Sequence, residues 1–282
     1  MKSIRQIRAA VSLLDPHKVR ESAGTPPKIG ILASGDDGYG EIEDFLLPPE
    51  MPHADRMRLI ACIHPAAEET NGTYDLAICY GDVPCASGAF VFDPANPDGM
   101  ISEILRARDD LSLSLARHFP RFRAPVVDRI VHRVASENAL FAIATALPNV
   151  IPNLIELPWS LGEFASDTAF LTFNQVRMAY LLAAACGKEI GLKHQKAEIV
   201  SIVGGAFGWR AVARELAGKI PFGGGIIPKG AIAYAGTIVV GKGLERFYHA
   251  RVHHTRAERK RIHREAFERG KSVVESLARD AG

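Results

Sequence analysis

The spacing of apolar and polar residues changes near residue 125 of the 282-residue chain. Before that point, short apolar runs bounded by turn residues predict strands, and helical spacing recurs between them. The predicted strands cover 28–33, 58–63, 74–79 and 89–92, and the predicted helices cover 3–14, 42–47 and 100–118. Strands that alternate with helices are typical of a small α/β domain with a mostly parallel sheet.

After residue 125, apolar residues recur at helical spacing and strand patterns are absent, so an all-α, glycine-rich domain is predicted. Its helices are expected from Val126 to Leu147, from a capping box at Ser160–Glu163 to Cys186, from His194 to Lys219, and from about residue 226 into a basic end. Residues 120–125 are predicted to be a basic, proline-bounded linker. The predicted parts are an α/β domain over 1–124, a helical domain over 125–250 and a basic C-terminal helix or tail over 251–282.

The first predicted strand leads into a glycine-rich segment, residues 35–42, where a P-loop protein would hold phosphate. Glu41 stands at the position of the phosphate-binding lysine, and Ile42 replaces the hydroxyl that ligates Mg²⁺. Gly35, Gly38 and Gly40 therefore form a vestigial loop, and no cofactor is expected. An ordinary Asp/Gly-rich turn without P-loop ancestry explains the same residues.

Charge is unevenly distributed along the chain. Between Asp36 and Asp110, sixteen Asp/Glu stand against four Arg, whereas Gly241 to Gly282 holds eleven Lys/Arg, six Asp/Glu and four His. The basic end is interpreted either as a solvated helix or as a surface for an anionic membrane. Nucleic acid is not an expected partner, because aromatic residues for base stacking are sparse there.

The apolar stretch from Gly230 to Gly241 is too short for a membrane span, since it would extend for about 18 Å as a helix, against a hydrocarbon core of about 30 Å. A buried core helix is favoured, and a re-entrant or surface-attached helix pair is the alternative. Small residues at helical spacing, Gly187 with Gly191 and Gly204 with Gly208, are expected to let helices approach closely.

Two polar residues interrupt the apolar helix predicted before Cys186. Arg177 lies among phenylalanines and needs a carboxylate, for which Glu156, Glu163, Asp167 or a residue of the first domain are candidates. Gln175 and Arg177 are interpreted as a hydrogen-bonded internal network or as a switch contact between domains.

No catalytic or metal-binding residue is predicted. The four cysteines, Cys62, Cys79, Cys85 and Cys186, support neither a zinc site nor a disulfide framework, which indicates a reducing, cytoplasmic location. His249 and His253 have helical i, i+4 spacing, but no third ligand follows at suitable spacing. No hydrolase motif is present.

Several segments in order resemble the YcjF-like bacterial domain of unknown function, which often follows Era-like GTPase domains. They are Ala146–Pro152, Asn174–Met178, Gly204–Gly208, Lys219–Gly225 and Ala233–Thr237. The resemblance covers about residues 125–250 and implies a membrane-associated partner of small GTPases, with the first domain in the place of the GTPase. The Asp-x-x-Gly and Asn-Lys-x-Asp signatures of GTPases are absent, so no nucleotide-binding residue is carried over.

These observations favour a non-catalytic regulatory or scaffolding protein, with a nucleotide-domain shape that lacks P-loop chemistry. Its expected partners are protein helices or an anionic membrane surface, and a homo-oligomer is left open. The expected location is the cytoplasm, with peripheral or integral attachment to the inner membrane as a further option. The alternatives are a GTPase-related nucleotide-binding protein with an unorthodox loop and a helical protein that inserts into or remodels membranes.

Overall fold

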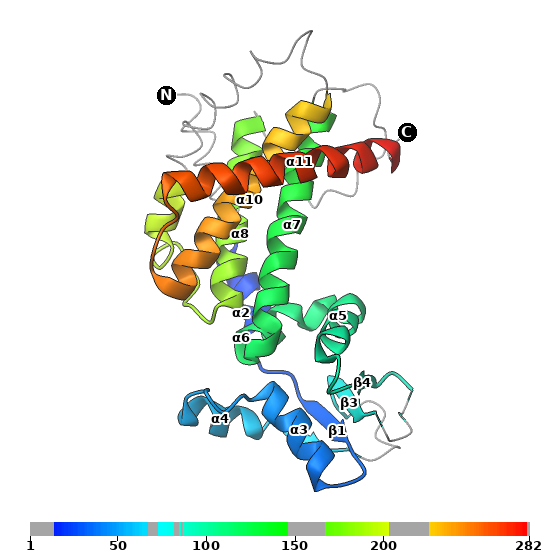
Figure 1. Cartoon of the computed structure of the whole chain (residues 1–282). Helices are drawn as coiled ribbons and strands as arrows, with labels where there is room; N and C mark the ends of the chain where they lie inside the picture. The colour runs from blue at the N-terminus through cyan, green and yellow to red at the C-terminus, as the bar shows by residue number, and fades with distance from the viewer. Residues whose placement is uncertain are drawn as a thin grey trace. The chain divides into compact units, whose positions relative to one another are not determined.

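The computed structural model describes residues 14–66, 73–81, 85, 87–145, 167–202 and 226–280. Its contacts divide the chain into two compact units (Figure 1). The α/β unit comprises His17–Asp128 with Ala184–Lys188. The helical unit comprises Met1–Pro16, Arg129–Ala183 and Glu189–Gly282. The helix predicted over 3–14 and the capping box predicted at Ser160–Glu163 lie outside the described residues.

The α/β unit alternates strands with helices along the chain. In order, its elements are α2 (Pro16–Gly24), β1 (Ile29–Leu32), α3 (Asp36–Leu46), α4 (His53–Ile60), β2 (Ile63–Pro65), β3 (Leu76–Tyr80), β4 (Phe90–Phe92), α5 (Pro97–Ala107), the 3-10 helix η1 (Asp109–Leu111), α6 (Ser112–His118) and the start of α7 (Pro120–Ala144).

The four strands form one parallel sheet in the order β2-β1-β3-β4. All four residues of β1 are buried, as expected for the inner strand of a parallel sheet that is covered on both faces. Ile29 of β1 is in register with Ile63 of β2 and with Leu76 of β3. The predicted α/β region with a small parallel sheet is confirmed.

Three of the predicted elements in this region are wrong. Most of the strand predicted over 58–63 is the end of α4, which buries Leu59, and β2 begins only at Ile63. The helix predicted over 100–118 is divided into α5, η1 and α6. The linker predicted over 120–125 is the first part of α7, because Pro120 occupies the first helical position, where no backbone N–H is needed.

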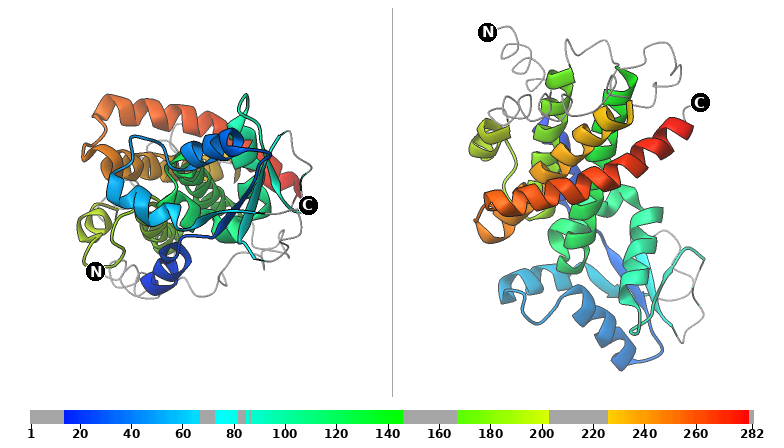
Figure 2. Two further views of the ribbon diagram at one scale, coloured as in Figure 1. Left: turned by 90° about the horizontal axis from the view of Figure 1, so that it is seen from below. Right: turned by 45° about the horizontal axis from the view of Figure 1, so that its top comes forward.

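The described part of the helical unit contains the rest of α7, α8 (Asp167–Ala185), a helical stretch over 196–202, α10 (Ile226–Ala250) and α11 (Arg256–Asp280). α10 and α11 pack against each other as neighbours along the chain, as both views of Figure 2 show. Phe141 of α7 and Phe170 of α8 stack with ring centroids 3.7 Å apart in the core of this unit.

The turn into α11 is stabilised by a reciprocal capping box that the sequence analysis missed. The Thr255 N–H donates to Glu258 at 2.7 Å, and the Glu258 N–H donates to the Thr255 hydroxyl at 3.2 Å. The pKa of Glu258 is lowered to about 2, most strongly by the hydrogen bond from the Thr255 N–H and then by the hydrogen bond from the guanidinium of Arg246. Glu258 is therefore ionised at neutral pH and fixes the start of α11.

Glycines allow the helices of this unit to approach closely. A Cβ atom on Gly241 of α10 would lie 2.6 Å from the Val131 side chain of α7, and one on Gly230 would lie 2.7 Å from Val274 of α11. A Cβ on Gly270 of α11 would lie 3.2 Å from the backbone of Ala231. The absence of these Cβ atoms therefore sets the distance between neighbouring helices.

Substitution of two glycines of α10 separates this packing constraint from helix propensity. We expect Gly241→Ala to destabilise the helical unit by about 1–3 kcal/mol, because branched Val131 must move. Gly243→Ala is the matched control: its Cβ meets no described atom within 4 Å, so helix propensity should make it neutral or stabilising by up to about 1 kcal/mol. Hydrogen exchange of the α10 amides measures both, and equal effects of the two substitutions would contradict the packing argument.

Candidate functional site

The strand order places the topological switch point of the sheet between β1 and β3, because the chain leaves these neighbouring strands toward opposite edges. In open α/β sheets, ligands bind at the carboxyl ends of the strands at this point. Here β1 is followed by α3 after only residues 33–35, and β3 ends at Tyr80. These residues are therefore where a nucleotide would be expected.

The glycine-rich loop or turn predicted over 35–42 is wrong, because α3 begins at Asp36 and includes Gly38 and Gly40. Gly35 is the N-cap residue, with extended backbone angles of φ −168° and ψ 177°. Asp36 and Asp37 lie in the first helical turn, where carboxylates stabilise the positive end of the helix dipole. The same carboxylates oppose an anion at this helix terminus, where phosphate groups bind in other α/β proteins.

Tyr80 occupies the space beside α3 at the end of β3. Its ring lies 3.1 Å from where a Gly38 Cβ would be, and its hydroxyl donates to Glu41 at 2.8 Å. Gly38 thus accommodates an aromatic ring of the same unit. Glu41, at the position of the P-loop lysine, accepts that hydrogen bond, and Ile42 is completely buried in the core.

This arrangement predicts the outcome of restoring a P-loop sequence. We expect Glu41→Lys with Ile42→Thr to give no Mg²⁺-dependent nucleotide binding, because the glycines are held in α3. The double substitution should also destabilise the α/β unit by about 2–4 kcal/mol, since it places a hydroxyl in the core and removes apolar volume. Titration with a fluorescent guanine nucleotide and a thermal melt measure the two effects.

Glu41→Lys alone and Ile42→Val are the controls for this experiment, because the first keeps the core and the second adds no hydroxyl. Saturable nucleotide binding by the double variant would show that the segment can still form a phosphate loop and would contradict this interpretation.

Arg177 is paired within the helical unit. Its Nη2 forms a short ion pair with Glu137 of α7, and the two side chains are 18% and 15% exposed. Asn174 donates to Glu137 at 3.2 Å and to Asn138 at 3.0 Å, and Asn138 donates to Thr237 of α10 at 2.8 Å. Arg177 therefore has a carboxylate partner, Glu137, that was not among the predicted candidates.

Glu137 precedes Arg177 by 40 positions in the sequence, and no local pattern joins the two residues. Glu156 and Glu163, two of the predicted partners, lie outside the described residues. Gln175 is buried, with 8% exposure, and lines a cavity within the helical unit. The observed contacts favour the internal-network interpretation for Arg177.

Removal of one member of this ion pair is expected to leave the other charge half-buried without this partner. Arg177→Met and Glu137→Met should each cost about 1–3 kcal/mol, whereas the double substitution should recover most of that loss. A double-mutant cycle read by hydrogen exchange of the α8 amides measures the coupling. Additive single effects would contradict a direct pair.

The structure describes one of the two glycine pairs that were predicted to let helices approach closely. Gly187 and Gly191 do not lie on a helix face, because both have positive φ, 68° and 152°, in the loop after α8. The Gly187 N–H donates to Ala184 at 3.0 Å in a helix C-terminal turn. Gly204 and Gly208 lie outside the described residues, as do the segments 146–152 and 219–225.

Two predictions about ligand chemistry need correction. Cys79 and Cys85 form a disulfide, so the argument from four free cysteines to a reducing compartment fails, and Cys62 and Cys186 are the free cysteines. His249 and His253 do not share a helix turn, since α10 ends at Ala250. Among the described residues, no group of three or more His, Cys, Asp or Glu could hold a metal ion.

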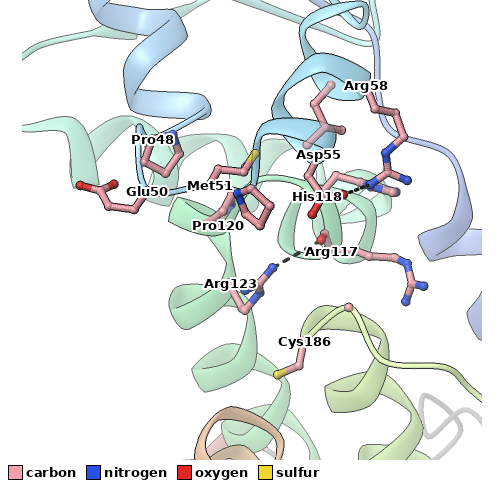
Figure 3. A pocket seen from close by; sticks show the side chains of 13 residues that line it. Pro48, Glu50, Met51, Asp55, Arg58, Arg117, His118, Pro120, Arg123 and Cys186 are labelled. Carbon is pink, nitrogen blue, oxygen red and sulfur yellow. Dashed lines mark hydrogen bonds and ion pairs between the residues drawn. The ribbon is translucent and has the colours of Figure 1, made fainter.

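A pocket that the sequence analysis did not predict lies in the α/β unit (Figure 3). Its volume is about 570 Å³, and basic side chains from three helices line it: Arg58 of α4, Arg117 and His118 of α6, and Arg123 of α7. We call these four residues and their cavity the arginine pocket. They are spread over some 65 positions without a motif, so no sequence signal joins them.

The helical unit carries a basic surface at the turn between α10 and α11. Its exposed cations are Arg251, Arg256, Arg259, Lys260, Arg261 and Arg264, which we call the basic turn surface. Between Arg251 and Arg264 the sequence has a single carboxylate, Glu258, which accepts a 2.7 Å hydrogen bond from Arg246. The surface therefore keeps a strong positive charge.

Comparison with protein-family models, with curated proteins and with solved structures finds no match to this chain. Among the described residues, no helix is both long enough and apolar enough to cross a membrane.

Proposed function

We propose that the protein is a non-catalytic regulatory or scaffolding protein that attaches peripherally to an anionic membrane through its basic turn surface. The concentration of exposed cations at that turn carries this proposal. Each Lys or Arg held near an anionic bilayer contributes about 1 kcal/mol of attraction. Val252, which is 45% exposed at the same turn, adds apolar area that can enter the headgroup region.

The backbone of the turn supports a role for its charge. Arg251 has a φ of 56°, in the left-handed region where glycine is favoured and where another residue costs about 1 kcal/mol. An arginine at this position thus keeps a cation at the tip of the turn at the expense of local backbone energy.

A membrane is favoured over nucleic acid because the aromatic rings of the turn are already covered. Phe247 has the Arg251 guanidinium 5.1 Å from its ring centre and the His253 ring stacked at 5.2 Å. Phe267 of α11 lies beneath Lys271 at 5.4 Å and beside His263. Rings in these contacts are poorly placed to stack on nucleic-acid bases.

A regulatory rather than catalytic role is supported by the switch point of the sheet, where Tyr80 and the acidic start of α3 replace a phosphate cradle. The resemblance of residues 125–250 to the YcjF-like domain stays a prediction, and it is consistent with a membrane-associated partner of other proteins.

Vesicle sedimentation of the purified full chain tests this function. We expect binding to vesicles that contain phosphatidylglycerol, loss of binding at high salt, and little binding to phosphatidylcholine alone. Arg251→Gly combined with Lys260→Gln and Arg261→Gln should weaken binding on the order of 100-fold, at about 1 kcal/mol for each charge. Glycine at residue 251 also relieves the left-handed backbone.

The matched control removes three exposed basic residues elsewhere, by Lys18→Gln, Arg20→Gln and Arg106→Gln. Equal loss in both triple variants would show that only net charge matters and would contradict the assigned surface. If duplex DNA bound more tightly than the vesicles, through the same residues, the partner of the basic turn surface would be nucleic acid and the membrane proposal would be wrong.

A further inference from the structure

We propose that the arginine pocket binds a small oxyanion, specifically the phosphate group of a phosphomonoester. The site is in the α/β unit and is independent of the proposed membrane attachment. Three arginines and a buried histidine line one cavity of this unit.

Two of the guanidinium groups are fixed by backbone carbonyls. Arg117 donates through Nη1 to Lys188 at 3.0 Å, and Arg123 donates through Nε to Ala185 at 3.1 Å. These carbonyls lie at and just beyond the end of α8, where cations are favourable. The bonds hold both side chains in place, and a guanidinium has more N–H donors than they use.

The carboxylates of the pocket compensate only part of this positive charge. Asp55 forms an ion pair with Arg58 at 3.4 Å, but both side chains are more than half exposed, which weakens their interaction. Glu50 points away from Arg58 and Arg117 (Figure 3). Among the described residues, the hydrogen-bond partners of Arg117 and Arg123 are backbone carbonyls, so both guanidinium charges can act on a ligand.

His118 lies within this positive environment and is 7% exposed. Its Nε2 donates to the carbonyls of Ala23 and Gly24 at 3.2 and 3.3 Å, which fixes its orientation. Burial lowers the pKa of His118, the charges of Arg58 and Arg117 lower it further, and the two carbonyls oppose these effects. An anion that binds beside Arg58 and Arg117 should therefore raise the pKa of His118, and this change can be measured.

The size and donor geometry of the pocket define the class of ligand. A guanidinium matches the paired oxygens of phosphate or carboxylate, and phosphate can accept from several guanidinium groups at once. The cavity of about 570 Å³ is larger than a single phosphate ion needs and falls within the size range of small-molecule sites. We therefore assign the remaining space to the organic part of a phosphomonoester.

NMR titration of His118 in the full chain tests the site, with inorganic phosphate and glycerol phosphate as probes and acetate as the comparison. We expect both phosphates to bind saturably and to raise the pKa of His118, with glycerol phosphate binding more tightly and acetate more weakly. If either phosphate leaves that pKa unchanged, or if acetate binds as well as phosphate, the assignment is overturned.

Arg58→Gln tests whether the arginines of the pocket bind the phosphate. Arg58 is suitable because it is exposed and does not hold the end of α8. It should weaken phosphate binding roughly tenfold, the change expected for loss of a hydrogen bond to a charged group. Arg106→Gln on α5 removes an exposed arginine of the same unit outside the pocket and should leave binding unchanged. Equal weakening by both variants would overturn the site, as would no weakening by Arg58→Gln.

Discussion

The arrangement of the helical unit depends on the close approach of helix backbones where glycine removes a side chain. Gly230 and Gly270 bring α10 and α11 together from opposite sides of their shared interface, and Gly241 does the same for α10 and α7. Once these helices are fixed, the Arg246–Glu258 ion pair and the Thr255 capping box fix the turn between α10 and α11. The basic residues of that turn remain exposed.

The two units use their charged groups in different ways. In the helical unit, Glu137 compensates the half-buried Arg177, whereas the cations of the basic turn surface remain in solvent. In the α/β unit, Asp36 and Asp37 begin a helix at the point where a nucleotide-binding fold would receive phosphate. Three arginines and a histidine of that unit instead line the arginine pocket, on other helices. The positive groups of the α/β unit therefore gather away from the switch point of its parallel sheet.

Local sequence patterns predicted the elements that depend on a continuous apolar run, including β1, β3 and β4. They failed where a short run suits two structures, as at 58–63, and where Pro120 was interpreted as a break although it begins α7. The capping box at Thr255 and Glu258 had a recognisable Thr-x-x-Glu signal. The Arg177–Glu137 pair and the arginine pocket depend on tertiary contacts, and spacing along the chain did not reveal them. The Cys79–Cys85 disulfide joins residues with a sequence separation of 6, a spacing that matches no cysteine motif.

The proposed function requires that electrostatic attraction through the basic turn surface holds this protein at a membrane. Fractionation of cells that produce the full chain, followed by separate high-salt and carbonate washes of the membrane pellet, tests it most directly. We predict that the protein sediments with membranes at low salt and that high salt alone releases it. Recovery in the supernatant at low salt, or retention through both washes, would contradict this account.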